Sequence, residues 1–230
     1  MKHKTRIWLQ PTVILGFILI FIIHCQKDND DKNNITVTDM DGNVYHTVTI
    51  GTQVWMVENL KTTKYNDGTA IPLVTNETTW SNLTTPGYCW LNNDSLTYKN
   101  PYGALYNWYV VNSNKLCPTN WHVPTEGEWT TLMNYLGGSD IAGGKLKEAG
   151  TIHWLTPNTG ATNETGFTAL PGSGRSYTGQ FGLLNKFGNW WSSTEENEYA
   201  FAVGVNFDDS HLGSFFIIKK SGSSVRCVKD

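Results

Sequence analysis

Charged side chains are scarce in this 230-residue chain, because Asp, Glu, Lys and Arg together make up only 16% of it. Disordered chains carry many charges and few aromatic residues, whereas this one has 10 Trp, 10 Tyr and 9 Phe. A packed core is therefore expected. The 17 cations stand against 20 anions, and no basic patch is present. The composition thus gives no support for nucleic acid as a partner.

Catalytic and metal-binding motifs are also missing. Neither Gly-x-Ser-x-Gly nor His-Glu-x-x-His occurs, and the carboxylates stand in no glycosidase-like arrangement. No Cys-x-x-Cys pair or histidine-rich spacing predicts zinc. We therefore expect a protein that is not an enzyme and has no cofactor. An exported hydrolase is the weaker alternative.

The N-terminal apolar run is short for a transmembrane helix. "VILGFILIFII" (Val13–Ile23) would form a helix of roughly 16 Å, against a bilayer core of about 30 Å. Cations precede it and Cys25 follows it, which resembles a bacterial lipoprotein signal peptide over residues 1–24. Cys25 would then be the lipidated first residue. Because His24 stands where a small residue is usual, a simple N-terminal membrane anchor stays open as the alternative.

The next segment, "CQKDNDDKNN" (25–34), is polar and has no hydrophobic period. Such a segment cannot bury apolar surface, so it is predicted to be a flexible acidic tether. Acidic residues directly after the cysteine resemble the signal that sends some lipoproteins to the outer surface of diderm bacteria. We therefore expect an outer-membrane lipoprotein that is exposed at the cell surface, with the membrane as a partner through its lipid anchor. A single domain would cover residues 35–230.

Three cysteines remain after Cys25, namely Cys89, Cys117 and Cys227. In an oxidising compartment they allow one disulfide and leave one thiol, and the count does not fix the pairing. Cys117 and His122 are close enough in sequence for nucleophilic chemistry, although a disulfide would remove that thiol. His122 is therefore interpreted as a hydrogen-bonded packing residue.

The first part of the domain is predicted to be an antiparallel meander over residues 35–60. Asp41-Gly42-Asn43 offers a turn with positive φ, and the following residues alternate with a period of two. A short strand is expected at 88–91. "NPYGALYNWYVVN" then predicts a helix with Asn100 as its N-cap and Pro101 as its first residue.

A second helix is predicted to begin after Thr125. Thr125 and Glu128 have the spacing of a capping box, and Gly137-Gly138 provides the end. Between them, four apolar residues form one buried stripe, at Trp129, Leu132, Met133 and Leu136.

The remainder is predicted to contain little helix. Residues 139–189 are rich in glycine and are interpreted as short strands and long loops. The runs after them predict an antiparallel sheet of about three strands. Its core face is expected to hold Phe201, Val203, Val205 and Phe207.

Several distinctive motifs occur along the chain in this order: "DGNVYHTVTIGTQVWMVENL", "YGALYNWYVVN", "LCPTNWHVPTEGEW", "KLKEAG", "GFTALPGSGRS", "WWSSTE" and "SVRCVKD". Together and in this order they resemble the Fibrobacter succinogenes major paralogous domain family. The resemblance covers about residues 35–230. It implies an α+β fold similar to C-type lectin domains and formylglycine-generating enzymes, in which two helices flank small twisted antiparallel sheets joined by long loops. It also implies a disulfide between Cys117 and Cys227.

The functional residues of those related folds are not found in this sequence. The Glu-Pro-Asn, Gln-Pro-Asp and Trp-Asn-Asp triplets of calcium-dependent lectins are absent, and Cys227 has no neighbouring cysteine as formylglycine-generating enzymes require. Neither a calcium and sugar site nor that catalysis is therefore carried over.

We expect a non-catalytic binding or adhesion module for a glycan or a surface protein. The alternative is a structural component of a surface assembly or appendage. Trp190 and Trp191 are the candidates for stacking on a sugar, with core packing as the alternative. Glu195, Asp208 and Asp209 offer oxygens for calcium, but their spacing matches no defined calcium loop, and a solvated acidic turn is the favoured interpretation.

Overall fold

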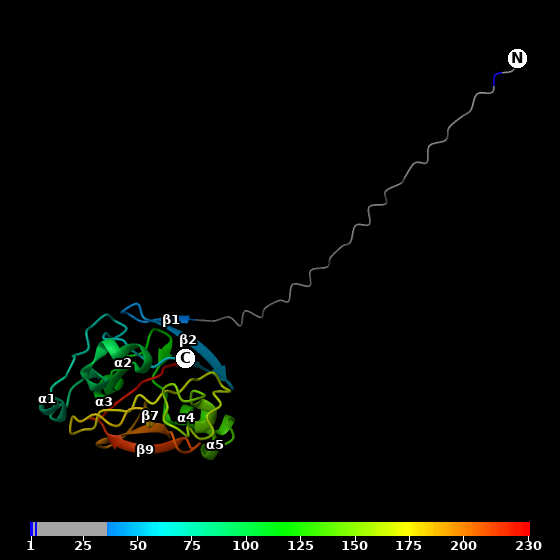
Figure 1. Ribbon diagram of the computed structural model, residues 1–230. Coiled ribbons are helices and arrows are strands. Elements are labelled where there is room, and N and C mark those ends of the chain that lie inside the picture. The colour runs from blue at the N-terminus through cyan, green and yellow to red at the C-terminus, as the bar shows by residue number, and fades with distance from the viewer. Residues whose placement is uncertain (2, 4–35) are drawn as a thin grey trace. The chain divides into compact units, whose positions relative to one another are not determined.

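The computed structural model describes residues 1, 3 and 36–230 (Figure 1). The predicted signal peptide, the lipidation site Cys25 and the tether lie outside the described residues. The chain divides into two units, 1–33 and 34–230, and the second contains all three hydrophobic clusters and the disulfide. Among the described residues, no helix combines the length and the apolar character needed to span a membrane.

The first sheet confirms the predicted meander and adds the C-terminal end of the chain. Asp39 accepts hydrogen bonds from the backbone N–H groups of Asp41 and Asn43, which fixes the first turn. The strand order is β1-β2-β3-β11-β6, and every pairing is antiparallel. The strands are β1 (Thr36–Thr38), β2 (Val44–Ile50), β3 (Gln53–Met56), β6 (Trp121–His122) and β11 (Val228–Lys229).

Two three-stranded antiparallel sheets complete the β-structure. One has the order β10-β5-β4 and contains the short strand predicted at 88–91. Its strands are β4 (Tyr88–Trp90), β5 (Ala104–Asn107) and β10 (Gly222–Ser223). The other has the order β7-β8-β9, from β7 (Phe187–Glu196), β8 (Tyr199–Asn206) and β9 (Gly213–Ile218).

Five α-helices and one short 3-10 helix are present in the described part of the chain, where the resemblance implied two flanking helices. They are α1 (Glu77–Ser81), η1 (Leu91–Asn93), α2 (Ser95–Tyr102), α3 (Trp108–Val111), α4 (Glu126–Tyr135) and α5 (Ser139–Leu146). The capping box of α4 is confirmed: the Thr125 hydroxyl accepts from the Glu128 N–H, and the Glu128 carboxylate accepts from the Thr125 N–H. The α+β class stands.

The helix predicted from Asn100 is wrong. Asp94 caps α2 instead, and Pro101 lies inside that helix near its end. Gly103 then stops it with a φ of 73°, and a Cβ there would lie 2.6 Å from the Leu60 carbonyl oxygen. Only glycine fits this close approach, so the chain leaves α2 and enters β5.

Two further expectations are corrected by the packing. α5 forms in the segment predicted to be strands and loops. In β8, Phe201 and Val203 are buried as predicted, but Ala200 and Ala202 on the opposite face are also 0% exposed. Separate hydrophobic clusters cover the two faces of this sheet, so both residue sets are core.

The long irregular run 147–186 is held by buried cations. The Lys147 amine donates to three carbonyl oxygens, at Thr159, Asn206 and Asp209. The Arg226 guanidinium donates to the carbonyls of Phe167 and Thr168. Carbonyls in a loop have no ladder partner, and these cations provide one.

Candidate binding pocket

The two tryptophans predicted to meet a ligand are both in the core. Trp190 is 1% exposed and donates to Asn59 Oδ1 over 2.8 Å, whereas Trp191 is 0% exposed and donates to the Tyr106 carbonyl over 2.7 Å. Neighbouring residues of a strand point to opposite faces, and both faces of β7 are covered. Neither ring is open to a sugar, which corrects the stacking prediction.

The acidic residues predicted to offer oxygens for calcium do not come together. Glu195 lies near the end of β7 and pairs with Lys219. Asp208 and Asp209 follow Asn206, which pairs with the first residue of β7, so they lie at the opposite end of the hairpin. The separation along the strands is roughly 20 Å or more. Within residues 36–230, no group of three or more acidic, histidine or cysteine side chains could hold a metal ion.

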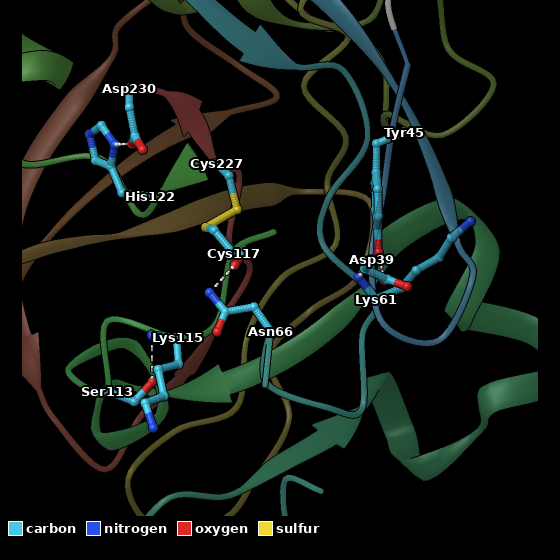
Figure 2. The surroundings of a disulfide bond; sticks show 10 residues. All are labelled: Asp39, Tyr45, Lys61, Asn66, Ser113, Lys115, Cys117, His122, Cys227 and Asp230. Carbon is cyan, nitrogen blue, oxygen red and sulfur yellow. Dashed lines mark hydrogen bonds and ion pairs between the residues drawn. A yellow bond between two sulfur atoms is a disulfide. The ribbon is translucent and has the colours of Figure 1, made fainter. Parts of the chain in front are cut away.

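The disulfide between Cys117 and Cys227 is confirmed, and Figure 2 shows it linking two segments that are 110 residues apart in the sequence. The Asn66 amide donates to the Cys117 carbonyl over 3.1 Å. Cys89 is free and fully buried, and burial raises the pKa of its thiol to about 12. The bridge and the protonated thiol leave no cysteine nucleophile in the described chain.

His122 is bound between two carboxylates. Its Nδ1 lies 2.6 Å from Asp230 Oδ1, and its Nε2 lies 2.8 Å from Glu128 Oε1 (Figure 2 shows the contact with Asp230). Although partial burial lowers the pKa of His122, the hydrogen bonds that its ring donates to Asp230 and Glu128 outweigh this effect and raise that pKa. Because Glu128 also caps α4, His122 ties β6, α4 and the last residues together, in line with the predicted packing role.

A pocket of about 340 Å³ lies where β7, β9 and β10 meet the glycine-rich strap 173–182. The strap is fixed by the backbone: the Ser173 N–H donates to the Phe187 carbonyl over 2.8 Å, and Arg175 exchanges two hydrogen bonds with Gly222. A Cβ on Gly174 would lie 2.8 Å from the Gly222 carbonyl oxygen. The absence of a side chain at Gly174 therefore allows the strap to lie directly against β10.

Arg175 braces this strap from inside. It is 2% exposed, and its guanidinium donates to three carbonyls, those of Gly179, Val74 and Thr75. The guanidinium also lies 4.6 Å from the ring centre of Trp80 and 4.9 Å from that of Phe181. These contacts occupy the cation and hold Phe181 at the pocket wall.

The lining of the pocket is polar but uncharged, apart from Arg175. Asn189 is 7% exposed, its Nδ2 donates to the Ser223 hydroxyl, and its Oδ1 has no hydrogen-bond partner among the described residues. Phe187 and Ile217 add an apolar side. The remaining hydroxyl and amide groups come from Ser173, Ser176, Gln180 and Ser221. No carboxylate or imidazole is among the described residues that line the pocket.

None of the ligand-contacting residues predicted from the sequence lines this pocket, although the first residues of its strap, 173–176, are the end of the motif "GFTALPGSGRS". The only indication of the pocket in the sequence is that Gly and Ser follow each other closely at 172–176 and again at 221–224. Small polar residues of this kind are typical of ordinary turns as well. Only the pairing of the strap with β10 shows that the two runs share one pocket.

A second hollow of about 240 Å³ lies beside the disulfide. Its walls are mixed, with Trp121 and Val123 on the apolar side and Thr125 and Ser193 on the polar side. His122 also lines it, but its ring nitrogens are already held by the two carboxylates. The uncharged pocket is therefore the better candidate for a ligand that brings its own hydroxyl groups.

Comparison with known proteins gives one match. The family model of the Fibrobacter succinogenes major domain matches residues 48–229. No match is found among curated proteins or among solved structures. The match covers nearly all of the domain, including the strap, β7 and both cysteines of the bridge.

Proposed function

The chain belongs to the Fibrobacter succinogenes major domain family, and we propose that it is a surface-anchored, non-catalytic module that binds a neutral glycan in the pocket beneath the strap. The lectin-like character of the fold is part of this proposal. So are the lipid anchor at Cys25 and the exposure of the domain at the cell surface. The alternative, a structural component of a surface assembly, is supported by a different feature, the free edge of β9.

The chemistry of the pocket lining carries the proposal. Sugars present many neutral hydroxyl groups on one side and C–H groups on the other. The lining matches both, with serine hydroxyls and amides on one part and Phe181, Phe187 and Ile217 on another. Arg175 is occupied by three carbonyls, so no free charge is left to select an ionic ligand. Pockets that fix orientation with a few polar groups on an apolar wall are typical of binding sites.

The same lining favours binding over turnover. Glycoside hydrolysis uses two carboxyl groups on either side of the scissile bond. The pocket-lining residues of the described chain supply neither of them. The nucleophile and base predicted as an alternative, Cys117 and His122, are held in the disulfide and between Glu128 and Asp230.

The test is a glycan array probed with the unit 34–230, which contains the whole described core. We expect binding to a neutral glycan, unchanged when calcium is removed by a chelator. Gln180→Ala and Ser176→Ala should each weaken it about tenfold, the equivalent of one lost hydrogen bond of about 1.4 kcal/mol. Asn134→Ala, an exposed amide on α4, is the matched control and should bind normally. Binding that survives both pocket substitutions would place the ligand elsewhere.

The anchor is tested separately on the full chain. Metabolic labelling with a fatty acid should mark the wild-type protein and not Cys25→Ser, and protease added to intact cells should remove the domain. A protein that is unlabelled and protected from protease would contradict the proposed anchor and exposure.

A further inference from the structure

The strap and β10 form a three-stranded ladder that makes one wall of the pocket. Arg175 pairs antiparallel with Gly222 of β10 on one side and with Phe181, in the returning limb of the strap, on the other. The Ser176 N–H also donates to the Gln180 carbonyl over 2.7 Å, next to the pair of Arg175 and Phe181. Because side chains alternate along each segment, Arg175, Gly222 and Phe181 share one face of this ladder, and their neighbours share the other.

Two glycines show which face of the ladder is turned to the pocket. A Cβ on Gly222 would lie 3.0 Å from the Trp80 ring, against which Arg175 also packs. A Cβ on Gly174 would lie 3.3 Å from Asn189 Oδ1, and Asn189 lines the pocket. The face of Arg175 is therefore turned to the core, and the face of Gly174 is turned to the pocket.

Three polar side chains form a row on the pocket face. They come from the residue before β10 and from the two limbs of the strap, at Ser221, Ser176 and Gln180. Neighbouring segments of a sheet are about 4.8 Å apart, so the row spans roughly 10 Å. Ser221 is 9% exposed, whereas Gln180 at the other end is exposed. Ser221 is therefore the innermost polar group of the row.

The Ser221 hydroxyl has no hydrogen-bond partner among the described residues. A buried hydroxyl without a partner is destabilising, and such groups are rare in folded proteins unless water or a ligand completes them. Ser223 on the same face differs, because it accepts a hydrogen bond from Asn189 Nδ2 over 2.7 Å. The Ser173 hydroxyl also has no partner among the described residues, but it lies against Gly182 and outside the row. Ser221 is thus the buried group of the row whose hydrogen bonds are left for a ligand.

We propose that Ser221 selects the ligand by a hydrogen bond with one of its hydroxyl groups, an inference that rests on the proposed binding of a neutral glycan. A serine hydroxyl both donates and accepts hydrogen bonds, so a sugar hydroxyl is its natural match. A deoxy sugar leaves Ser221 without a partner, and a methoxy group adds bulk and removes the donor. Sites that hydrogen-bond a ligand hydroxyl in this way discriminate strongly against the analogue that lacks it. The ligand is therefore a neutral glycan with a free hydroxyl at the position that reaches Ser221.

Nuclear magnetic resonance titration of the unit 34–230 with the methyl glycosides of glucose, galactose and mannose tests this role. The Gln180 side-chain amide, at the outer end of the row, reports that the pocket is occupied. We expect at least one glycoside to bind, and one of its monodeoxy derivatives to bind about tenfold more weakly because one hydrogen bond is lost. Ser221→Ala should weaken binding of the parent glycoside by the same factor and should no longer distinguish it from that derivative.

The melting temperature separates recognition from a structural role. Ser221→Ala deletes a hydroxyl without a partner, so the melting temperature should be unchanged or slightly raised. Ser223→Ala, two residues away on the same face, leaves the Asn189 amide without its acceptor and should lower the melting temperature. Ser214→Ala, at an exposed residue of β9 outside the described lining of the pocket, is the matched control for binding and should titrate as the wild type does.

The glycan array probed with Ser221→Ala extends the test to neutral glycans longer than one residue, whose binding should also fall about tenfold. Glycans that bind Ser221→Ala as tightly as the wild type would overturn the role of Ser221 and leave the proposed function intact. So would a glycoside whose monodeoxy derivatives all bind as well as the parent. A wild-type protein that binds neither the glycosides nor any neutral glycan of the array would contradict the proposed function itself, and this role with it.

Discussion

The five-stranded sheet and the irregular run 147–186 are both anchored to the rest of the domain, but by different means. The sheet receives the C-terminal strand β11, which is only two residues long, and the Cys117–Cys227 disulfide fixes that end covalently. The irregular run has only isolated bridges, from Lys147 to Ala169, from Ser173 to Gly188 and from Arg175 to Phe181 and Gly222. Buried side chains add further hydrogen bonds to its main chain.

Three buried cations that have no acidic partner bind the main-chain carbonyls of this region. Lys147, Arg175 and Arg226 each donate to two or three main-chain carbonyls, and none forms an ion pair with a described residue. A carbonyl in a loop has no strand beside it, so a buried ammonium or guanidinium that bonds several carbonyls takes the place of a ladder. The difference shows that a region poor in secondary structure can still be ordered if its acceptors converge on a few donors.

The largest expected effect comes from breaking the covalent tie. Replacing Cys117 and Cys227 with serine should lower the free energy of unfolding by about 4–5 kcal/mol, because the unfolded chain regains the entropy of a loop of 110 residues. Urea unfolding measures this, and the native spectrum should be retained. Cys89→Ala, at the free buried thiol, is the control and should cost about 1 kcal/mol. Equal costs for the two changes would contradict a special role for the bridge.

Removing the guanidinium of Arg226, which holds two carbonyls of the irregular run, should lower the free energy of unfolding somewhat less. Arg226→Met leaves the carbonyls of Phe167 and Thr168 without their donor, at about 3 kcal/mol in total. Arg226→Lys should not rescue it, because an ammonium lacks the fork that reaches both. Hydrogen exchange should show faster opening around residues 163–169 than around β2. Uniform loss of protection would mean that the cation has no local role.

Lys147→Met should lower the free energy of unfolding by about 2 kcal/mol at neutral pH, because three carbonyls lose the ammonium group that donates to all of them. Burial lowers the pKa of Lys147 to about 8, whereas the unfolded value is about 10.4. Between these values the unfolded chain binds more protons, so the stability of the wild type relative to Lys147→Met should rise with pH. The free energies of unfolding of wild type and Lys147→Met, measured at pH 7 and pH 9.5, check this direction. A difference between the two proteins that is smaller at pH 9.5 than at pH 7 would contradict it.

The smallest effect is expected at His122, which lies in β6 of the five-stranded sheet that the disulfide fixes. Its pKa is raised in the folded protein, so its stabilising contribution is complete below about pH 6.5 and is lost as the pH rises through the folded pKa. The side chain is 38% exposed, which limits the effect to about 0.5 kcal/mol. His122→Gln should remove this pH dependence. The measurement is the difference in urea midpoint between wild type and variant at pH 5.5 and pH 8.

Local patterns predicted the parts of the fold that depend on neighbours in the sequence. The meander follows from period-two alternation and a glycine turn, and α4 from the spacing of Thr125 and Glu128. The helix expected from Asn100 failed because Gly103 lies against the Leu60 carbonyl, a contact between segments far apart in the chain. For the same reason the candidate pocket could not be predicted, since its strap (173–182) and the lining residues 221–223 at β10 are separated in the sequence by β7, β8 and β9.

By itself, the sequence determined the α+β class, the family and the cap of α4, because these depend on composition, motif order and spacings of a few residues. The tertiary structure alone decided that Trp190 and Trp191 are both core, since two clusters close over opposite faces of one strand. It also decided which small polar residues share a pocket and which strand has a free edge. Those properties arise from long-range contacts between segments, which no local pattern in the sequence encodes.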